Sequence, residues 1–514
     1  MTDTRLVDAD ELTADLHATS GRTVRVRLPF SGEVGHDLPH SSVDDVADAA
    51  AAGRAAQRAW WDAGPSHRRA VLLRAHDLLL QRRGELLDLV QLETGKTRGQ
   101  AFEEVFQGAS VTRYSALSTH RAVAAERRRA GIPGVIRTEV TYRPKGLVGV
   151  ITPWNYPLSL ALMDAVPALA TGNAVLQKTD DQATLSVLAA RRAFLDAGVP
   201  EEIWSVVTGE GDTIGSAVVD SADYVCFTGS TETGRRVAER AARGLTGASL
   251  ELGGKNPLIV LDDVDPARAA RDTAYAAFAA MGQLCVSIER VYVLRGVADA
   301  YLDELTAVTD GLRQGGALDY STDVGALATP AQLDRVAAHV DDAIAKGATV
   351  LAGGHPRPEL GPLFYAPTVL TDLRETMTCA REETFGAVLG VTVVDSEEEA
   401  VERANDSSYG LNAAIFSGDR RRARRLARRL HAGSVNINEG YRATFASIDA
   451  PMGGLGQSGL GRRNGIEGLR RFVEPVTIAE ATGLLQLPRT GEEFERMTGP
   501  MLLLLRGLKA ARRR

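Results

Sequence analysis

Two hydrophobic patterns follow one another along this chain. Residues 42–118 are rich in Ala, Leu, Arg and Glu, and apolar residues recur at helical spacing, as in Val71, Leu72 and Ala75. Apolar positions three and four residues apart line one face of a helix, so this segment predicts several amphipathic helices. Residues 138–150 are largely β-formers instead.

Beyond that point, short apolar runs alternate with helical stretches such as 183–197. The runs predict strands at 147–151, 174–177, 203–207, 224–227, 257–261, 290–294, 387–394, 413–417 and 434–437. Strands that alternate with helices favour parallel sheets. Because the pattern resumes after about residue 270, we predict an α/β fold with two Rossmann-like parallel-sheet domains.

The bulk composition narrows the functional class. A chain of 514 residues is too long for one core and predicts two or three domains. The net charge of −7 argues against nucleic acid as the main partner. No apolar run approaches the ~20 residues that a membrane span needs. Three cysteines, Cys226, Cys285 and Cys379, without a signal peptide, indicate a cytoplasmic protein without disulfides.

A thiol and a carboxylate carry the most informative chemistry. Cys285 ends the sequence Gly-Gln-Leu-Cys, and Glu251 opens Glu-Leu-Gly-Gly-Lys. A thiolate can attack an electrophilic carbon, and a carboxylate can activate the water that releases the product. A lone cysteine is more often a small buried hydrophobe. The glycines and polar residues around both positions favour the nucleophile here.

Other motifs supply complementary groups. The turn 152–157 offers the amide of Asn155 to a developing oxyanion. Lys178 ends a predicted strand, where ligands bind in open α/β sheets. Residues 227–234 join a strand end to a glycine-spaced helix start suited to phosphate. The pattern GxGxxG at 454–459 has no preceding strand, so we reject it as a dinucleotide fingerprint.

In this order, and with an acid and an aromatic at 382–386 and a Gly-rich loop at 451–462, these motifs closely resemble the NAD(P)-dependent aldehyde dehydrogenase superfamily. The surroundings of Cys285 and Asn438 are most similar to actinobacterial enzymes usually called succinate-semialdehyde dehydrogenases. The resemblance implies a small β oligomerisation arm beside the two larger domains, and a homodimer or homotetramer. The implied divisions are a cofactor-binding domain (20–120 and 144–253), a catalytic domain (254–450), the arm (121–143 and 470–482) and a C-terminal extension (483–514).

The resemblance also implies residue roles. Cys285 matches the nucleophile, Glu251 the general base and Asn155 the oxyanion donor of a reaction that oxidises an aldehyde to an acid through a thioester. The implied cofactor is NAD or NADP, without a metal, at Thr152, Pro153, Trp154, Lys178, Asp181, Gly229, Ser230, Gly253, Glu383 and Phe385. Lys178 and Asp181 match the positions at the adenosine ribose. A carboxylate there would repel the 2′-phosphate of NADP, so NAD is favoured.

The substrate stays open between two kinds of aldehyde. Better-understood succinate-semialdehyde dehydrogenases use two arginines for the distal carboxylate, and the matching positions here are Met163 and Ala279. Arg442 could replace them, or it is a solvated loop residue and the aldehyde is uncharged. Other readings are weaker. Glu251 argues against thioester transfer to coenzyme A, and a Cys-dependent hydrolase needs a His that these motifs lack. The complete set of Asn155, Glu251 and Cys285 opposes a non-catalytic binding role.

The C-terminal segment is separate from these motifs. Met501 and four leucines precede five basic residues at 506–514. Such a segment can dock on an anionic membrane surface. We favour the alternative, a terminal helix that packs on its own subunit or on a neighbour.

Overall fold

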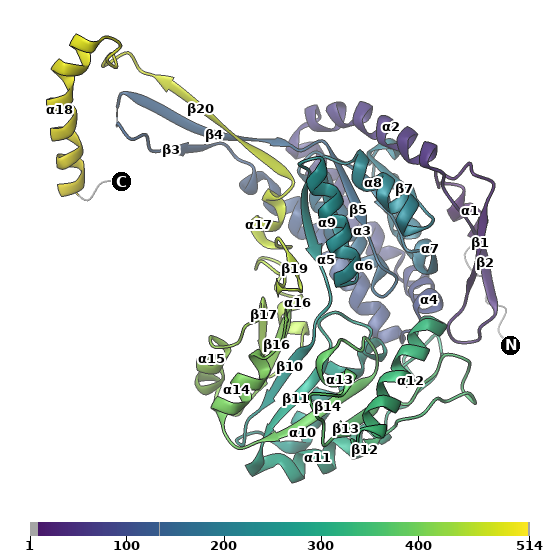
Figure 1. Cartoon of the computed structure of the whole chain (residues 1–514). Helices are drawn as coiled ribbons and strands as arrows, with labels where there is room; N and C mark the ends of the chain where they lie inside the picture. Colours follow the sequence, from purple (N-terminus) through teal and green to yellow (C-terminus); the bar gives the residue numbers. More distant parts are fainter. Residues whose placement is uncertain (1–8, 133, 512–514) are drawn as a thin grey trace.

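The architecture was obtained as a computed structural model that describes residues 9–132 and 134–511. Two α/β lobes lie one above the other in Figure 1, and a long β arm extends from them toward the C-terminal helix. This arrangement confirms the predicted fold class of two parallel-sheet units with a small β arm. The domain boundaries within it stay predictions.

The upper lobe is built on a six-stranded sheet with the order β19-β9-β8-β5-β6-β7. Its five long strands are parallel and buried along most of their length, which explains why they read as continuous apolar runs. They are β5 (Leu147–Ile151), β6 (Ala174–Lys178), β7 (Trp204–Val207), β8 (Tyr224–Thr228) and β9 (Gly247–Glu251). The short β19 (Gly459–Leu460) joins β9 in the antiparallel sense.

Helices cover this sheet. The segment 42–118 forms α2 (Val43–Asp62), α3 (Gly64–Gln81), α4 (Arg83–Thr94) and α5 (Arg98–Ala122), as the helical spacing predicted. Every residue of α6 (Pro157–Ala170) is buried, because this helix lies between the sheet and α5. The remaining cover comes from α7 (Thr184–Asp196), α8 (Ser216–Ser221) and α9 (Thr231–Arg243).

The lower lobe contains a seven-stranded sheet with the order β12-β13-β14-β11-β10-β16-β17. All strands are parallel except β12 at the edge. The strands are β10 (Asn256–Val260), β11 (Ile288–Leu294), β12 (Thr349–Ala352), β13 (Thr368–Thr371), β14 (Val388–Val394), β16 (Asn412–Phe416) and β17 (Ser434–Ile437). The main helices are α10 (Pro266–Phe278), α11 (Arg295–Asp310), α12 (Pro330–Ala345), α14 (Glu397–Asn405) and α15 (Arg420–Ala427).

The arginine run at 420–429 lies mainly on α15, which buries Ala423 and Leu426 and exposes most of its arginines. This is the solvated helix face expected of a charge run. Smaller elements complete the lobes: α13 (Thr378–Arg381), α16 (Arg442–Phe445), α17 (Gly465–Arg470), β15 (Tyr409–Gly410) and β18 (Leu455–Gly456).

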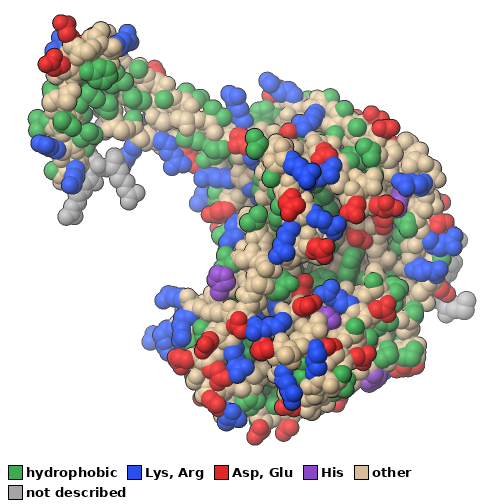
Figure 2. Space-filling model, viewed as in Figure 1, with side chains coloured by type: hydrophobic (Ala, Val, Ile, Leu, Met, Phe, Trp, Pro, Cys, Tyr) green, Lys and Arg blue, Asp and Glu red, His purple; other side chains and the backbone are tan. Residues whose placement is uncertain are grey.

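The arm consists of β3 (Glu126–Arg128), β4 (Ile136–Pro144) and β20 (Val473–Ala481) in one antiparallel sheet. It leaves the lobes and carries α18 (Gly491–Ala510) at its far end (Figure 1). No residue of α18 is buried, and Leu502–Leu505 are exposed beside other hydrophobic side chains (Figure 2). The predicted terminal helix therefore forms, but packing on its own subunit is wrong. Packing of this helix on a neighbouring subunit, or its docking on a membrane surface, stays a prediction.

An N-terminal hairpin was not predicted from the sequence. After α1 (Ala9–Thr13), strands β1 (Thr23–Arg27) and β2 (Val34–Pro39) pair in the antiparallel sense and bury Val26 and Leu38. His40 follows this hairpin directly, which brings it to the upper lobe. None of the described helices is long and apolar enough to cross a membrane.

Candidate active site

The predicted site residues follow the carboxyl ends of neighbouring strands in the upper sheet. In spatial order, Glu251 ends β9, Gly229 follows β8, Thr152 follows β5 and Lys178 ends β6. Strands lie ~4.8 Å apart, so this edge spans ~14 Å. Ligands of open α/β sheets bind along this edge, and its length suits an extended dinucleotide.

The turn after β5 is fixed by hydrogen bonds at both ends. The backbone N–H of Thr152 donates to the carbonyl of Lys178 at 3.1 Å. The Nδ2 of Asn155 donates to the carbonyl of Gln283 at 2.9 Å, and the Asn155 carbonyl accepts from Lys96 Nζ at 2.7 Å. The buried amide is therefore directed at the segment that carries Cys285.

Cys285 lies between the short helix η4 (Ala279–Gly282) and β11. Its side chain is half-buried, whereas Cys226 and Cys379 are buried. Gly282 adopts a φ of +70°, and a Cβ there would stand 2.3 Å from the carbonyl oxygen of Gly386. Only glycine permits both the left-handed backbone and this close approach. The Cys285 loop thus lies against the turn that contains Phe385.

Glu251 is buried at the end of β9, and its Oε1 has no hydrogen-bond partner among the described residues. Burial raises the pKa of this carboxyl to about 7, although the charges of Arg463 and Arg471 act in the opposite direction. Arg463 is itself buried between Asp164 and the hydroxyl of Thr228, the strand partner of Glu251. A carboxyl with a pKa near 7 can serve as a proton acceptor at neutral pH.

The thiol of Cys285 is not stabilised as a thiolate by the chain. Burial raises its pKa to about 12, and the negative charges of Glu251 and Glu383 act in the same direction. Two anions side by side are unfavourable, so the thiolate of Cys285 is favoured when Glu251 is protonated.

The Gly253-Gly254 pair makes room for Glu383. The N–H of Gly254 donates to Glu383 Oε1 at 2.8 Å, and a Cβ on Gly253 would stand 2.2 Å from Glu383 Oε2. Burial, together with the nearby charge of Glu289, raises the pKa of the Glu383 carboxyl to about 8. The two glycines therefore let the carboxyl group of Glu383 lie directly against the backbone that follows Glu251.

Phe385 is held in a left-handed conformation with a φ of +54°. Glu289 accepts hydrogen bonds from the N–H groups of Thr384 and Phe385, each at 2.9 Å, and pairs with buried Lys255. The ring of Phe385 meets Trp154 edge-on, with centroids 5.7 Å apart. This contact joins the turn after β5 to the turn before β14 across the two lobes.

Gly229 and Ser230 lie between β8 and the first residue of α9, Thr231. The Ser230 hydroxyl accepts from the N–H of Thr233 at 3.3 Å as the N-cap, and Ser230 is exposed. A Cβ on Gly229 would stand 2.6 Å from the Phe227 ring. A helix N-terminus with free N–H groups favours an anionic group such as a pyrophosphate.

At the far end of the edge, Lys178 is buried and Asp181 lies on η1 (Asp181–Ala183). Asp181 Oδ2 lies 2.9 Å from His40 Nε2, and Oδ1 accepts from the N–H of Gly209 at 3.0 Å. Sequence reasoning missed His40, because the hairpin that positions it has no strong pattern. It also missed Lys96 and Arg463, because each contacts a residue that is distant from it in sequence: Lys96 contacts Asn155, and Arg463 contacts Thr228.

On the opposite side of Cys285 lies a hydrophobic cluster that includes Met163 and Ala279. Tyr275 and Tyr441 border it and donate hydrogen bonds to the carboxyl oxygens of Glu103, at 2.6 and 3.0 Å. Arg442 lies over the Tyr275 ring at 4.2 Å and pairs with Glu439 at 2.8 Å. Arg442 is therefore half-exposed and already paired, rather than freely solvated.

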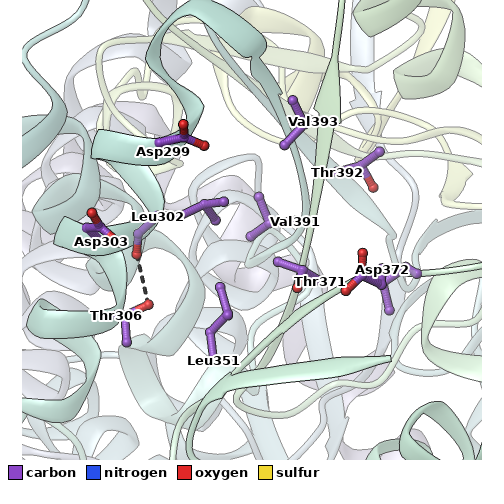
Figure 3. Close-up of a pocket in the computed structure, with 11 residues that line it drawn as sticks. Asp299, Leu302, Asp303, Thr306, Leu351, Thr371, Asp372, Val391, Thr392 and Val393 are labelled. Carbon is purple, nitrogen blue, oxygen red and sulfur yellow. Dashed lines mark hydrogen bonds between the residues drawn. The ribbon is translucent and has the colours of Figure 1, made fainter. Parts of the chain in front are cut away.

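A separate pocket lies between α11 and strands β12–β14 (Figure 3). Asp299, Asp303 and Thr306 line one side, and the Thr306 hydroxyl is bound to the carbonyl of Leu302 at 2.8 Å. None of its lining residues is a candidate catalytic or cofactor residue. We assign it no role.

The fold and site describe an α/β chain in which the strand ends of the upper sheet lead to the half-buried thiol of Cys285. The glycines at 229, 253 and 254 let the Phe227 ring, the Glu383 carboxyl and the Asn256 amide approach the backbone closely. The strand ends and the helix N-terminus capped by Ser230 are the groups that fit a dinucleotide.

Comparison with known proteins identifies the family of this chain. Residues 16–478 match the aldehyde dehydrogenase family. A Mycolicibacterium smegmatis protein, provisionally named succinate-semialdehyde dehydrogenase (NADP(+)), is 44% identical over 93% of this chain and 92% of its own length. A betaine aldehyde dehydrogenase of Rhizobium leguminosarum is 36% identical over 91% of this chain and 96% of its own length. The crystal structure of a Staphylococcus aureus betaine aldehyde dehydrogenase with NAD+ has a TM-score of 0.87 at 30% identity, over 92% and 95% of the two chains.

The chain belongs to the aldehyde dehydrogenase family. It oxidises an aldehyde to a carboxylic acid with a nicotinamide cofactor.

Proposed function

We propose that Cys285, Glu251 and Asn155 carry out this oxidation. The observation that supports the assignment most directly is the hydrogen bond from Asn155 to Gln283, which directs an amide at the loop of the half-exposed thiol. Glu251, with its unpaired Oε1 and a pKa near 7, supplies the proton acceptor.

The proposed reaction has two stages. The Cys285 thiol gives its proton to solvent, and the sulfur forms a bond to the aldehyde carbon while the carbonyl oxygen becomes an oxyanion. An N–H of Asn155 stabilises that oxyanion. A nicotinamide held by Glu383 and Phe385 would supply the acceptor for the hydride that leaves this carbon, and a thioester would remain on Cys285. Glu251 then removes a proton from water, which attacks the thioester and releases the acid, and the sulfur regains a proton as the thiol.

We propose that the cofactor lies along the strand edge. Lys178 and Asp181 hold the adenosine ribose, Gly229 and Ser230 the pyrophosphate, and Gly253, Glu383 and Phe385 the nicotinamide end. Thr152, Pro153 and Trp154 form the wall between them. The Asp181 carboxylate favours NAD, because its charge opposes a 2′-phosphate, whereas the 44% identical relative is named for NADP(+).

Intact-mass spectrometry tests the covalent step. After mixing with aldehyde and cofactor, the Glu251→Gln variant should gain the mass of one acyl group, located on the peptide of Cys285. An adduct on Cys226 or Cys379, or none although a burst of reduced cofactor is seen, would overturn the assignment.

For the substrate, we propose a semialdehyde whose distal carboxylate meets Arg442. The names of the mycobacterial relatives support this choice. A second candidate is an uncharged aldehyde. Arg442 is already neutralised by Glu439, and the buried Met163 and Ala279 offer only apolar surface.

We also propose a homo-oligomer in the cytoplasm. The arm strands β4 and β20 project from the lobes with half-buried and exposed side chains, which a second copy can cover. Light scattering of the purified enzyme distinguishes a monomer from a dimer or a tetramer.

A further inference from the structure

The carboxylate of Asp181 is held by two donors from different parts of the chain. His40 Nε2 lies 2.9 Å from Oδ2, and the Gly209 N–H lies 3.0 Å from Oδ1. Asp181 is on η1, His40 follows β2 and Gly209 follows β7. A carboxylate fixed at both oxygens cannot turn away from its neighbours, so its charge stays at one place.

His40 is itself firmly placed. Its side chain is 11% exposed, and its ring lies 3.7 Å from the position that a Cβ on Gly209 would take. Gly209 has a φ of +124°, which favours glycine and lets the imidazole approach. The backbone of His40 bonds to Arg22 through its N–H and to the Ser20 hydroxyl through its carbonyl.

Few other charges meet this imidazole. The surrounding elements carry several ionisable residues. Arg25, Arg27, His36 and Asp37 lie on the β1–β2 hairpin, where Arg25 pairs with Asp37. The others include Arg22 before β1, Lys178 at the end of β6, Asp180 beside η1 and Glu210 after β7. Asp180 accepts from the N–H of Gln182 at 3.0 Å, and Arg22 meets His40 only through its backbone carbonyl. Among the described residues, the ionised partner in contact with His40 is Asp181.

We propose that His40 determines how well this chain accepts NADP beside NAD, by positioning Asp181 and by cancelling its charge when the imidazole is protonated. The inference rests on the proposed place of the adenosine ribose at Lys178 and Asp181. A neutral imidazole donates its N–H and leaves a full negative charge toward the 2′ position. A protonated imidazole makes the pair neutral, so a 2′-phosphate is no longer repelled.

The test measures binding directly, without turnover. Dissociation constants for NAD and NADP are obtained between pH 5.5 and 8.5 from the quenching of tryptophan fluorescence, since Trp154 lies at the proposed site. The proteins are native enzyme, His40→Gln, which keeps a donor near the Nε2 position but cannot be protonated, and His40→Lys, which carries a permanent charge.

The ratio of the NAD to the NADP dissociation constant should rise by roughly tenfold to a hundredfold as pH falls in the native protein. Part of this rise is common to all variants, because the 2′-phosphate of the cofactor also gains a proton near pH ~6. The inference requires a smaller rise in His40→Gln, and a ratio in His40→Lys that is already high at pH 8.5. A His40→Gln profile equal to the native one would overturn it.

The variant Asp181→Asn separates this inference from the proposed cofactor site. If Asp181 borders the ribose, the neutral amide should improve NADP binding at every pH. No change in Asp181→Asn means that the ribose position itself is wrong. If Asp181→Asn improves NADP binding while His40→Gln keeps the native pH profile, only the role of His40 is rejected, and the proposed ribose position stays in place. Native-like melting temperatures and NAD affinity show that His40→Gln is folded, and His40→Lys gives an independent reading.

Discussion

The Nδ2 of Asn155 donates one hydrogen bond to the carbonyl of Gln283, two residues before Cys285. A side-chain amide has two N–H donors. One of them therefore fixes the amide against the nucleophile loop, and the second remains for an oxyanion. In the proposed mechanism, this one side chain both fixes the loop of Cys285 and stabilises the oxyanion.

We expect Asn155→Ala to lower kcat by roughly 10²–10³-fold, the usual effect of removing one oxyanion donor. Asn155→Asp keeps the size but loses the donors and adds a charge, so it should be at least as slow. Steady-state kinetics with near-saturating aldehyde measure both. Retention of native kcat in Asn155→Ala would contradict the oxyanion role.

Replacement of the nucleophile should abolish oxidation while cofactor binding persists. Cys285→Ala removes the sulfur that forms the thioester. The matched controls are Cys226→Ala and Cys379→Ala, whose side chains are buried away from the proposed site. Turnover and NAD affinity are measured for all three, and a Cys285→Ala enzyme with near-normal turnover would falsify the covalent mechanism.

The second half-reaction should depend on Glu251. Glu251→Gln should slow steady-state turnover by roughly 10²–10⁴-fold, while a first-turnover burst of reduced cofactor survives. Because a base must be deprotonated, thioester hydrolysis in the native enzyme should rise with pH through about 7, the pKa raised by burial. This limb of the profile should be absent from Glu251→Gln. An unchanged profile in the variant would assign the base elsewhere.

Sequence patterns could predict the strands at the site because buried parallel strands are continuous apolar runs. The strand at 147–151 was predicted with the bounds that β5 has. The hairpin β1–β2 was missed because Arg25 and Arg27 alternate with Val24 and Val26, so β1 is not a continuous apolar run. The contact between His40 and Asp181 spans 141 positions in sequence. No local pattern encodes such a pair, and the same holds for Arg463 beside Thr228.

Protein stability should also report the burial of Glu251. A carboxyl whose pKa is raised in the folded state stays protonated there while the unfolded chain ionises. The native enzyme should therefore lose stability as pH rises from about 4.5 to about 7, by up to about 3 kcal/mol. Glu251→Gln lacks this loss and should melt at a higher temperature than native enzyme at pH 8, but not at pH 4.5. Equal melting differences at both pH values would mean that Glu251 is solvated.

The last prediction concerns the tail of the aldehyde. Arg442 lies over the Tyr275 ring and pairs with Glu439, so it is placed at the hydrophobic cluster around Cys285 but is not a free cation. If the substrate is succinate semialdehyde, its carboxylate must compete with Glu439 for the guanidinium. Because the Arg442 side chain is 44% exposed, solvent screens the pair, and its removal should cost about 1–2 kcal/mol rather than the larger value of a desolvated pair. Arg442→Ala should then lower kcat/KM for succinate semialdehyde by roughly tenfold and leave butanal, an uncharged aldehyde of similar length, unchanged. Glu439→Gln is the matched variant: it frees the guanidinium and should improve kcat/KM for the acid substrate alone. Equal effects on both aldehydes in both variants would reject the anchor and favour an uncharged substrate bound by the apolar wall of Met163 and Ala279.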